Sequence, residues 1–494
     1  TTYAMTKKEN IQRWHNAYQK ALSQSPTIGG DGVVRIFEKL VGSPPLPKED
    51  AEAHDVYLHL LEDLRRMEDF ERNYPLAMVA FGSARLADDD PYYLLAAEVG
   101  ERLAEEGYLV RTGAGPGIMD AVPAGYKRMS SLLSLGSNAG ESVTNNNGPT
   151  QGIRIELPFE QAVSPSIDTN TMMKTFAIRR TALIWNSRGI AVFPGGLGTI
   201  NELFEAWVGA ADRKVDCPIV VIPTAFYRPF LDAIEQSAVV QRRTIQLSDF
   251  NLVEHSSHDA AEAVRLLRQP MRSKKSGTQF TLREKLLYLR HELGRGLTTV
   301  SNLRPAIVFM GSVHSLSIRD PEVQFVGSLS KNLVTTTSFG IRIGVGGVIN
   351  DAISQAVGKV ATSNENEDDV IQRILMTDEM AKERNSTDAH FESRSAHCET
   401  LIDNAMAAIF LPSDIAALNV LFALVCEIQT KRRTRMPVFL VGRKFWQPIL
   451  NGLQETLLSN GEDGQFIESN DLNIMEVIGT TQQDLCNVME RMEC

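Results

Sequence analysis

The chain has 494 residues, of which 43% are hydrophobic and 22% charged, and its formal net charge is −11. That length exceeds one ordinary core, so we expect two to three domains, and the acidic balance argues against a general nucleic-acid binder. No run of about 18 apolar residues is present, so no membrane span is expected. The five cysteines show no paired spacing, which favours reduced thiols in a cytoplasmic protein.

Residues 1–74 are expected to form a helical N-terminal extension. Val56, Leu60, Leu64 and Met67 recur there at helical spacing. This pattern favours a packing or dimerisation arm over a catalytic role.

From residue 75 onward, apolar runs, glycine turns and helical patterns alternate. The expected strands are residues 77–81, 108–111, 153–157, 189–193 and 217–222, with a helix over about 91–107. This alternation predicts a doubly wound α/β fold with a parallel sheet, in which ligands lie at the carboxyl ends of the strands. The turns at Gly82, Gly113–Gly117 and Gly195–Gly198 should therefore share one edge of the sheet.

The segment Pro194–Glu202, with the sequence PGGLGTINE, links an apolar run to an amphipathic one. Its glycines allow the backbone to approach a ligand closely, and the amides of a helix start attract an anion such as phosphate. Thr199 can cap the helix and donate its hydroxyl group, and Glu202 follows one turn later. The pattern predicts a nucleotide site with a carboxylate at its rim; a plain strand–helix turn is the alternative.

This segment resembles the PGGxGTxxE signature of the Lonely Guy family, long labelled lysine decarboxylases. The family comprises Rossmann-like phosphoribohydrolases that split nucleoside 5′-monophosphates into base and ribose 5-phosphate. The likeness extends to Leu157–Gln161 and to Arg179–Arg180, and it spans roughly residues 75–235. It implies that Arg179, fifteen residues before Pro194, takes the catalytic arginine position, whereas Arg180 replaces the family's usual lysine.

The expected chemistry is hydrolysis of the N-glycosidic bond of an AMP-like nucleoside 5′-monophosphate. A carboxylate can stabilise the ribosyl cation and orient water, and Glu202 is the candidate. Arg179 and Arg180 can bind the phosphate or assist the departing base, and which does which stays open. The full set of expected substrate and phosphate contacts is Gly82, Ser83, Gly113, Gly115, Gly117, Asp120, Arg180, Gly195, Gly196, Gly198 and Thr199.

Other ligands and roles are not indicated by the sequence. The spacing of Gly113–Gly117 is not that of a nicotinamide fingerprint, so a mononucleotide is expected and no cofactor. The histidines show no metal-ligand spacing, and nothing marks Lys174 as a pyridoxal phosphate lysine. A helix-dipole or capping role for Asp120 is as plausible as a catalytic one.

The second half of the chain repeats the first. Residues 306–312, 344–352 and 437–441 echo 77–83, 113–121 and 218–222, at offsets of 229, 231 and 219. The chemistry is lost: Ser413, Asp414, Ala416, Ala417 and Val420 replace the glycines, Thr199 and Glu202, and His397 and Cys398 replace the arginine pair. We expect a structural or regulatory pseudo-copy.

The expected domains are the extension at 1–74, a catalytic Rossmann-like domain at 75–255, linking helices at 256–300 and a degenerate second domain at 301–494. The polar residues 136–151 are expected to form a mobile loop, either a flexible insertion or a lid. Two other functions remain open, a non-catalytic nucleotide or cofactor carrier or sensor, and a scaffold. A homo-oligomer is also expected.

Overall fold

A computed structural model gives the fold. It describes residues 76–136, 148–156, 162–185, 187–269, 304–312, 315–344, 347–358, 370–376, 389–391, 394–458, 466–468 and 470–492, together with residues 62, 63, 66, 289, 292, 293 and 296. The expectations for 1–74, 136–151, 157–161 and 281–294 fall mostly outside these residues.

The first sheet has seven parallel strands in the order β4-β3-β2-β1-β5-β6-β7. The strands are β1 (Ala77–Phe81), β2 (Val110–Thr112), β3 (Gln151–Ile155), β4 (Thr169–Met173), β5 (Ser187–Val192), β6 (Ile219–Val221) and β7 (Val253–His255). The helices are α4 (Pro91–Glu105), α5 (Ile118–Gly136), α6 (Phe176–Trp185), α7 (Leu197–Ala211), α8 (Thr224–Ile234), η1 (Glu235–Gln241), α9 (Leu247–Phe250) and α10 (Ala260–Leu267). The strand order reverses between β1 and β5, where a doubly wound sheet opens a crevice for ligands.

The second sheet repeats this topology in the order β11-β10-β9-β8-β12-β13-β14. Its strands are β8 (Ala306–Met310), β9 (Gly340–Ile343), β10 (Ile371–Met376), β11 (Ala389–Phe391), β12 (Ala405–Phe410), β13 (Val438–Val441) and β14 (Met475–Ile478). Its helices are α12 (Pro321–Thr336), α13 (Val348–Gly358), α15 (Arg394–Ile402), α16 (Ile415–Gln429), α17 (Arg443–Leu458), η3 (Leu472–Ile474) and α18 (Gln482–Met492). The predicted fold of two tandem doubly wound domains is confirmed.

The two sheets also share a local irregularity. The register of β1 against β5 shifts between Ala77 and Met78, and the register of β12 against β8 shifts at the matching place, between Ala405 and Ala407. A shared shift of this kind supports the duplication that the sequence offsets predict.

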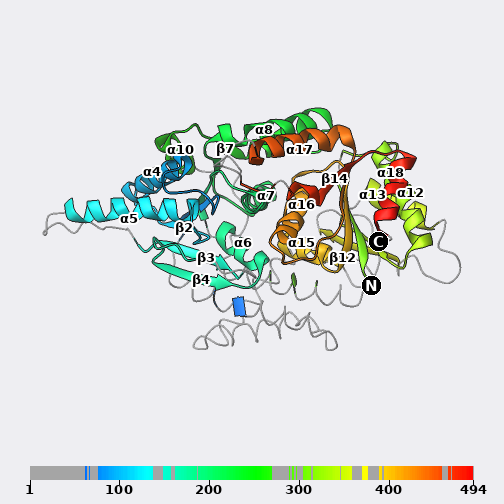
Figure 1. Cartoon of the computed structure of the whole chain (residues 1–494), viewed down its shortest axis with the longest axis horizontal. Coiled ribbons are helices and arrows are strands. Elements are labelled where there is room, and N and C mark those ends of the chain that lie inside the picture. Colours follow the sequence, from blue (N-terminus) through cyan, green and yellow to red (C-terminus); the bar gives the residue numbers. More distant parts are fainter. Residues whose placement is uncertain are drawn as a thin grey trace.

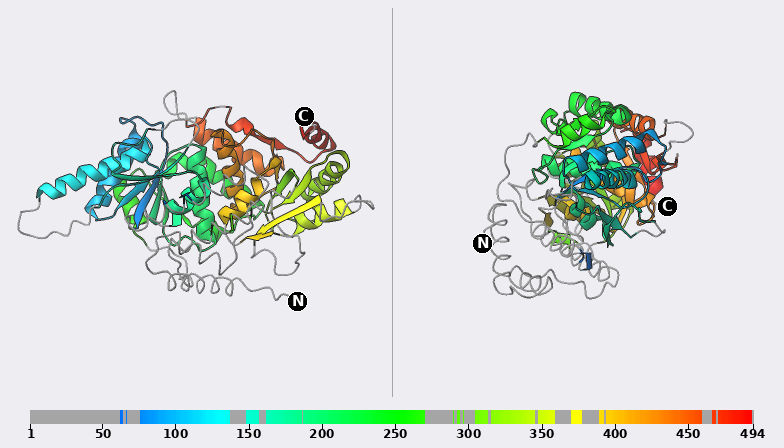
Figure 2. Two further views of the ribbon diagram at one scale, coloured as in Figure 1. Left: turned by 90° about the horizontal axis from the view of Figure 1, so that it is seen from below. Right: turned by 90° about the vertical axis from the view of Figure 1, so that its left-hand side faces the viewer.

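The two domains pack through equivalent helices. Helix α7 packs on α16 and α8 on α17, and Figure 1 shows α8 and α17 lying side by side along one edge of the molecule. Phe204 and Phe422, which are 218 residues apart, stack face to face with ring centroids 5.0 Å apart. Contacts between equivalent positions are typical of a two-fold interface. The chain therefore forms an internal pseudo-dimer, and the left view of Figure 2 shows its two domains next to each other.

Several strand predictions need correction. Strand β2 begins at Val110, two residues later than predicted, and β3 spans Gln151–Ile155 where 153–157 was predicted. The edge strand β4, with the sequence TNTMM, was missed because it is partly exposed and lacks an apolar run.

Candidate functional site

Three glycine turns meet at the switch point of the first sheet. They follow the adjacent strands β2, β1 and β5, as predicted. The amide of Ser83 donates to the carbonyl of Pro194 at 2.9 Å, and the carbonyl of Ser83 accepts from the amide of Ile118 at 2.9 Å. The turn after β1 is therefore hydrogen-bonded to the other two turns, and these backbone groups of Ser83 stabilise the fold.

Gly117 shows why one of these turns needs glycine. Its φ angle is +65°, and a Cβ atom there would lie 2.3 Å from the carbonyl oxygen of Ser83. Glycine is the residue that adopts this conformation without steric cost. A Cβ atom on Gly113 would similarly lie 2.6 Å from Nη2 of Arg179, so Gly113 leaves room for that guanidinium group.

Helix α7 begins after a residue that has no side chain. Gly196 is its N-cap residue and therefore supplies no side-chain cap. The prediction that Thr199 caps this helix is wrong, because the helix starts at Leu197 and Thr199 lies inside its first turn. A helix N-terminus presents amides and a positive dipole end to an anion.

Arg179 and Glu202 form a buried ion pair beside that N-terminus. Nη1 of Arg179 donates to Oε1 of Glu202, and Nε donates to the carbonyl of Ile153 at 3.3 Å. The two residues are 7% and 9% exposed. The structure thus brings together the two residues predicted to be catalytic, Arg179 from helix α6 and Glu202 from helix α7.

Arg180 points into the seam between the domains. Its Nη2 donates to Glu399 of the second domain at 3.1 Å, its Nη1 donates to Asn201 at 3.4 Å, and Nε lies 3.9 Å from Glu205. Burial alone would lower the pKa of Arg180, but Glu205 and Glu399 raise it. A contact between Arg180 and the phosphate stays a prediction. Within the chain, Arg180 links the two domains.

Asp120 belongs to a hydrogen-bond network separate from the Arg179–Glu202 pair. It accepts from the hydroxyl of Tyr93 at 2.7 Å and from that of Ser164. Burial would raise the pKa of Asp120, but the hydrogen bonds from Ser164, Tyr93 and Ser166 lower it. These contacts fix Asp120 near the turn after β2 and do not join it to Arg179 or Glu202.

Two further residues next to the glycine turn after β5 were not predicted to belong to the site. The hydroxyl of the fully buried Tyr227 donates to the carbonyl of Phe193 at 2.8 Å, and burial followed by the charge of Glu202 raises its pKa. The carbonyl oxygen of Phe466, from the second domain, lies 2.7 Å from where a Cβ atom of Gly196 would stand. The repeat is the signal that could indicate Tyr227, because Phe226–Tyr227 of the first copy stands where the second copy has Phe445–Trp446.

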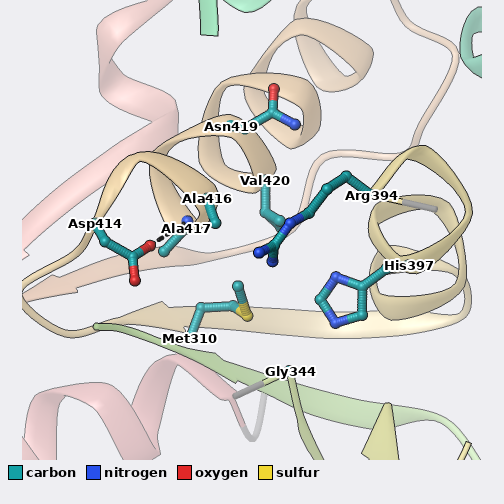
Figure 3. A pocket seen from close by; sticks show the side chains of 9 residues that line it. All are labelled: Met310, Gly344, Arg394, His397, Asp414, Ala416, Ala417, Asn419 and Val420. Carbon is teal, nitrogen blue, oxygen red and sulfur yellow. Dashed lines mark hydrogen bonds between the residues drawn. The ribbon is translucent and has the colours of Figure 1, made fainter. Parts of the chain in front are cut away.

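The corresponding place in the second domain is a small pocket without the same chemistry (Figure 3). Asp414 caps α16 with its own carboxylate, which accepts from the amide of Ala417 at 3.0 Å. A carboxylate therefore occupies the start of α16, where the equivalent helix α7 of the first domain has glycine. Burial lowers the pKa of His397 to about 4, so its ring is neutral near pH 7, and burial raises the pKa of the neighbouring Cys398.

The geometry defines a parallel α/β protein with a glycine turn at a helix N-terminus and a buried arginine–glutamate pair at its switch point. Residues 137–267 match the family model described as "Possible lysine decarboxylase". The match covers most of the first domain and agrees with the resemblance of the central motif.

Three solved structures are similar to part of the chain. A structural-genomics target is 22% identical, covers 38% of this chain and 96% of its own, and has a TM-score of 0.26. The molybdenum cofactor binding protein of the phototrophic bacterium Rippkaea orientalis is 18% identical, with coverages of 39% and 95% and a TM-score of 0.27. The molybdenum cofactor carrier protein of Chlamydomonas reinhardtii is 19% identical, with coverages of 39% and 98% and a TM-score of 0.26. No curated protein matches the chain.

No group of three or more histidine, cysteine, aspartate or glutamate side chains in the described part of the chain could hold a metal ion. None of the helices described is long and apolar enough to cross a membrane.

Proposed function

We propose that the first domain hydrolyses the N-glycosidic bond of nucleoside 5′-monophosphates. The observation that carries the proposal is the pairing of Arg179 with Glu202 in α7, a helix whose N-cap residue is glycine. The family match of residues 137–267 is compatible with a nucleotide-related role.

The 5′-phosphate would bind at the start of α7. The amides after Gly196 and the hydroxyl group of Thr199 offer donors there, and the helix dipole favours an anion. Thr199 is buried, so the phosphate would be partly removed from water, where charge-assisted hydrogen bonds are strongest.

Glu202 and Arg179 would act at the ribose. As the bond from C1′ to the base nitrogen breaks, its electron pair leaves with the base and positive charge develops on the ribose. The carboxylate of Glu202 can stabilise that charge and orient the water whose oxygen bonds to C1′. The water supplies one proton to the base and its hydroxyl group to the sugar. Arg179 would hold the carboxylate of Glu202 in place until substrate arrives.

The test compares AMP with adenosine, and then the other nucleoside monophosphates, with chromatographic detection of free base. We expect base release from a monophosphate and binding of the nucleoside weaker by about 3 kcal/mol, because the charge-assisted bonds to the phosphate are lost. Equal turnover of AMP and adenosine would contradict the phosphate role. Tight binding of monophosphates without any base release would favour the carrier or sensor function instead.

A further inference from the structure

The start of helix α6 is held by residues from the N-terminal part of the chain. The carboxylate of Asp63 accepts from the amide of Lys174 at 2.8 Å, from the amide of Thr175 at 2.7 Å and from the Thr175 hydroxyl group. Arg66 donates to the carbonyl of Met172 at 2.6 Å, and Glu62 pairs with Lys174 at 2.9 Å. The junction between β4 and α6 is thus bound by three helical residues that lie more than 100 positions earlier.

Asp63 binds the N-cap residue of α6, Thr175, and the residue before it. Thr175 stands directly before the first helical residue, where a threonine hydroxyl usually accepts from the helix amides. Here that hydroxyl donates to Asp63 instead. Asp63 is fully buried, and a buried carboxylate is tolerated when several donors satisfy it, as these do. Its negative charge also complements the N-terminal end of the helix dipole.

A short chain of bonds connects Asp63 to the candidate site. Asp63 accepts from the amide of Thr175, and the carbonyl of the same residue accepts from the amide of Arg179 at 3.1 Å. Arg179 in turn meets Glu202 across the site. From the other side, Arg432 of the second domain donates to the carbonyl of Lys174 at 2.8 Å.

We propose that Asp63 is a positioning residue, which binds the start of α6 from the N-terminal extension and so fixes Arg179 opposite Glu202. The structural part of this proposal stands alone, and its effect on turnover rests on the proposed function. It assigns the extension a part in the site, beyond a packing or dimerisation arm.

Asp63→Ala in the full chain tests the proposal, with Asp259→Ala as the matched control. Asp259 caps α10 through the amides of Ala261 and Glu262, so both variants lose an aspartate that accepts from backbone amides at the start of a helix. Hydrogen exchange is followed by mass spectrometry. Because loss of such an aspartate costs about 1 kcal/mol, we expect roughly fivefold faster exchange over residues 174–179 in Asp63→Ala. Asp259→Ala should leave that segment unchanged.

A second, milder variant keeps the proposal testable if Asp63→Ala does not fold. Thr175→Val has nearly the same shape and removes one donor to Asp63, so we expect a smaller acceleration over the same residues. Unchanged exchange at 174–179 in every folded variant would overturn the proposal.

Turnover provides the readout that a purely structural role would not move. If the parental chain releases base, Asp63→Ala should lower kcat about five- to tenfold with KM nearly unchanged, because Arg179 orients Glu202, which acts on charge that develops only in the transition state. A rise in KM alone would contradict the positioning of Arg179. If exchange accelerates but the parental chain releases no base, the contact of Asp63 with α6 is supported and the proposed function fails.

Discussion

At the scale of single residues, Glu202 carries the proposed chemistry. Glu202→Gln keeps the shape of the side chain and removes the negative charge that the developing ribosyl cation needs. We expect a folded protein that still binds a monophosphate but loses base release, with stability lowered by up to about 3 kcal/mol because Arg179 stays buried without its counter-ion. Chromatographic detection of base, with calorimetry for binding, checks this. Parental turnover by Glu202→Gln would exclude the role.

The residues of this site were predictable to different degrees. Arg179, Glu202 and the glycines followed from a compact motif whose spacing constrains the backbone. The seam contacts of Arg180 could not be predicted, because its partner Glu399 lies 219 residues away and belongs to the second domain. The role of Asp63 could not be predicted for the same reason, because a contact from a distant segment leaves no local pattern in the sequence.

At the scale of elements, the packing of α8 on α17 depends on a glycine. A Cβ atom on Gly452 would lie 2.4 Å from the carbonyl oxygen of Pro229. Gly327, inside α12, has no atom closer than 3.5 Å to such a Cβ. Alanine in a helix interior is favoured over glycine by about 1 kcal/mol. We therefore expect Gly327→Ala to raise the free energy of unfolding and Gly452→Ala to lower it, as measured by denaturant titration. A higher free energy of unfolding in Gly452→Ala would mean that α8 and α17 can move apart without cost.

The contact between α15 and α6 should make stability depend on pH. Burial, followed by the charge of Glu427, raises the pKa of Glu399, and Arg180 opposes this. The folded state then binds a proton that the unfolded state releases above a pKa of about 4.3. The free energy of unfolding should therefore fall as pH rises through the interval above that value. Unfolding titrations between pH 4 and 8 should show this decline in the parental chain, and Glu399→Gln should flatten it. An equal dependence of stability on pH in the parental chain and in Glu399→Gln would contradict the assignment of this effect to Glu399.

The elements differ in how far the sequence determines them. Strands such as β1 and β8 were predicted because they are continuous apolar runs followed by glycine turns, which is typical of a sheet buried on both faces. Strand β4 is polar and lies at an edge, where exposure removes the hydrophobic signal. The cap of α7 was misplaced by three residues because glycine and threonine can both occupy an N-cap, and only the backbone geometry decides between them.

At the scale of the whole molecule, the two domains form one packed unit with one site of the proposed kind. The second domain covers α7 and α8, brings Phe466 against Gly196, and pairs Arg394 with Asp212 at 2.9 Å. Phe204 is fully buried against Phe422. The second copy therefore contributes the apolar surface that completes the first.

The last prediction concerns the number of sites and the fate of a half-molecule. Calorimetric titration with a nonhydrolysable monophosphate should find one site per chain, because Asp414 already caps α16 while the N-cap residue of α7 is glycine. Arg179→Ala should abolish turnover. Asp414→Asn should leave it near the parental level, since asparagine caps a helix about as well as aspartate. A chain ending near residue 300 should aggregate, because it exposes the buried aromatic faces of α7 and α8. Two equivalent binding sites, or a soluble and fully active first half, would contradict the single-site pseudo-dimer.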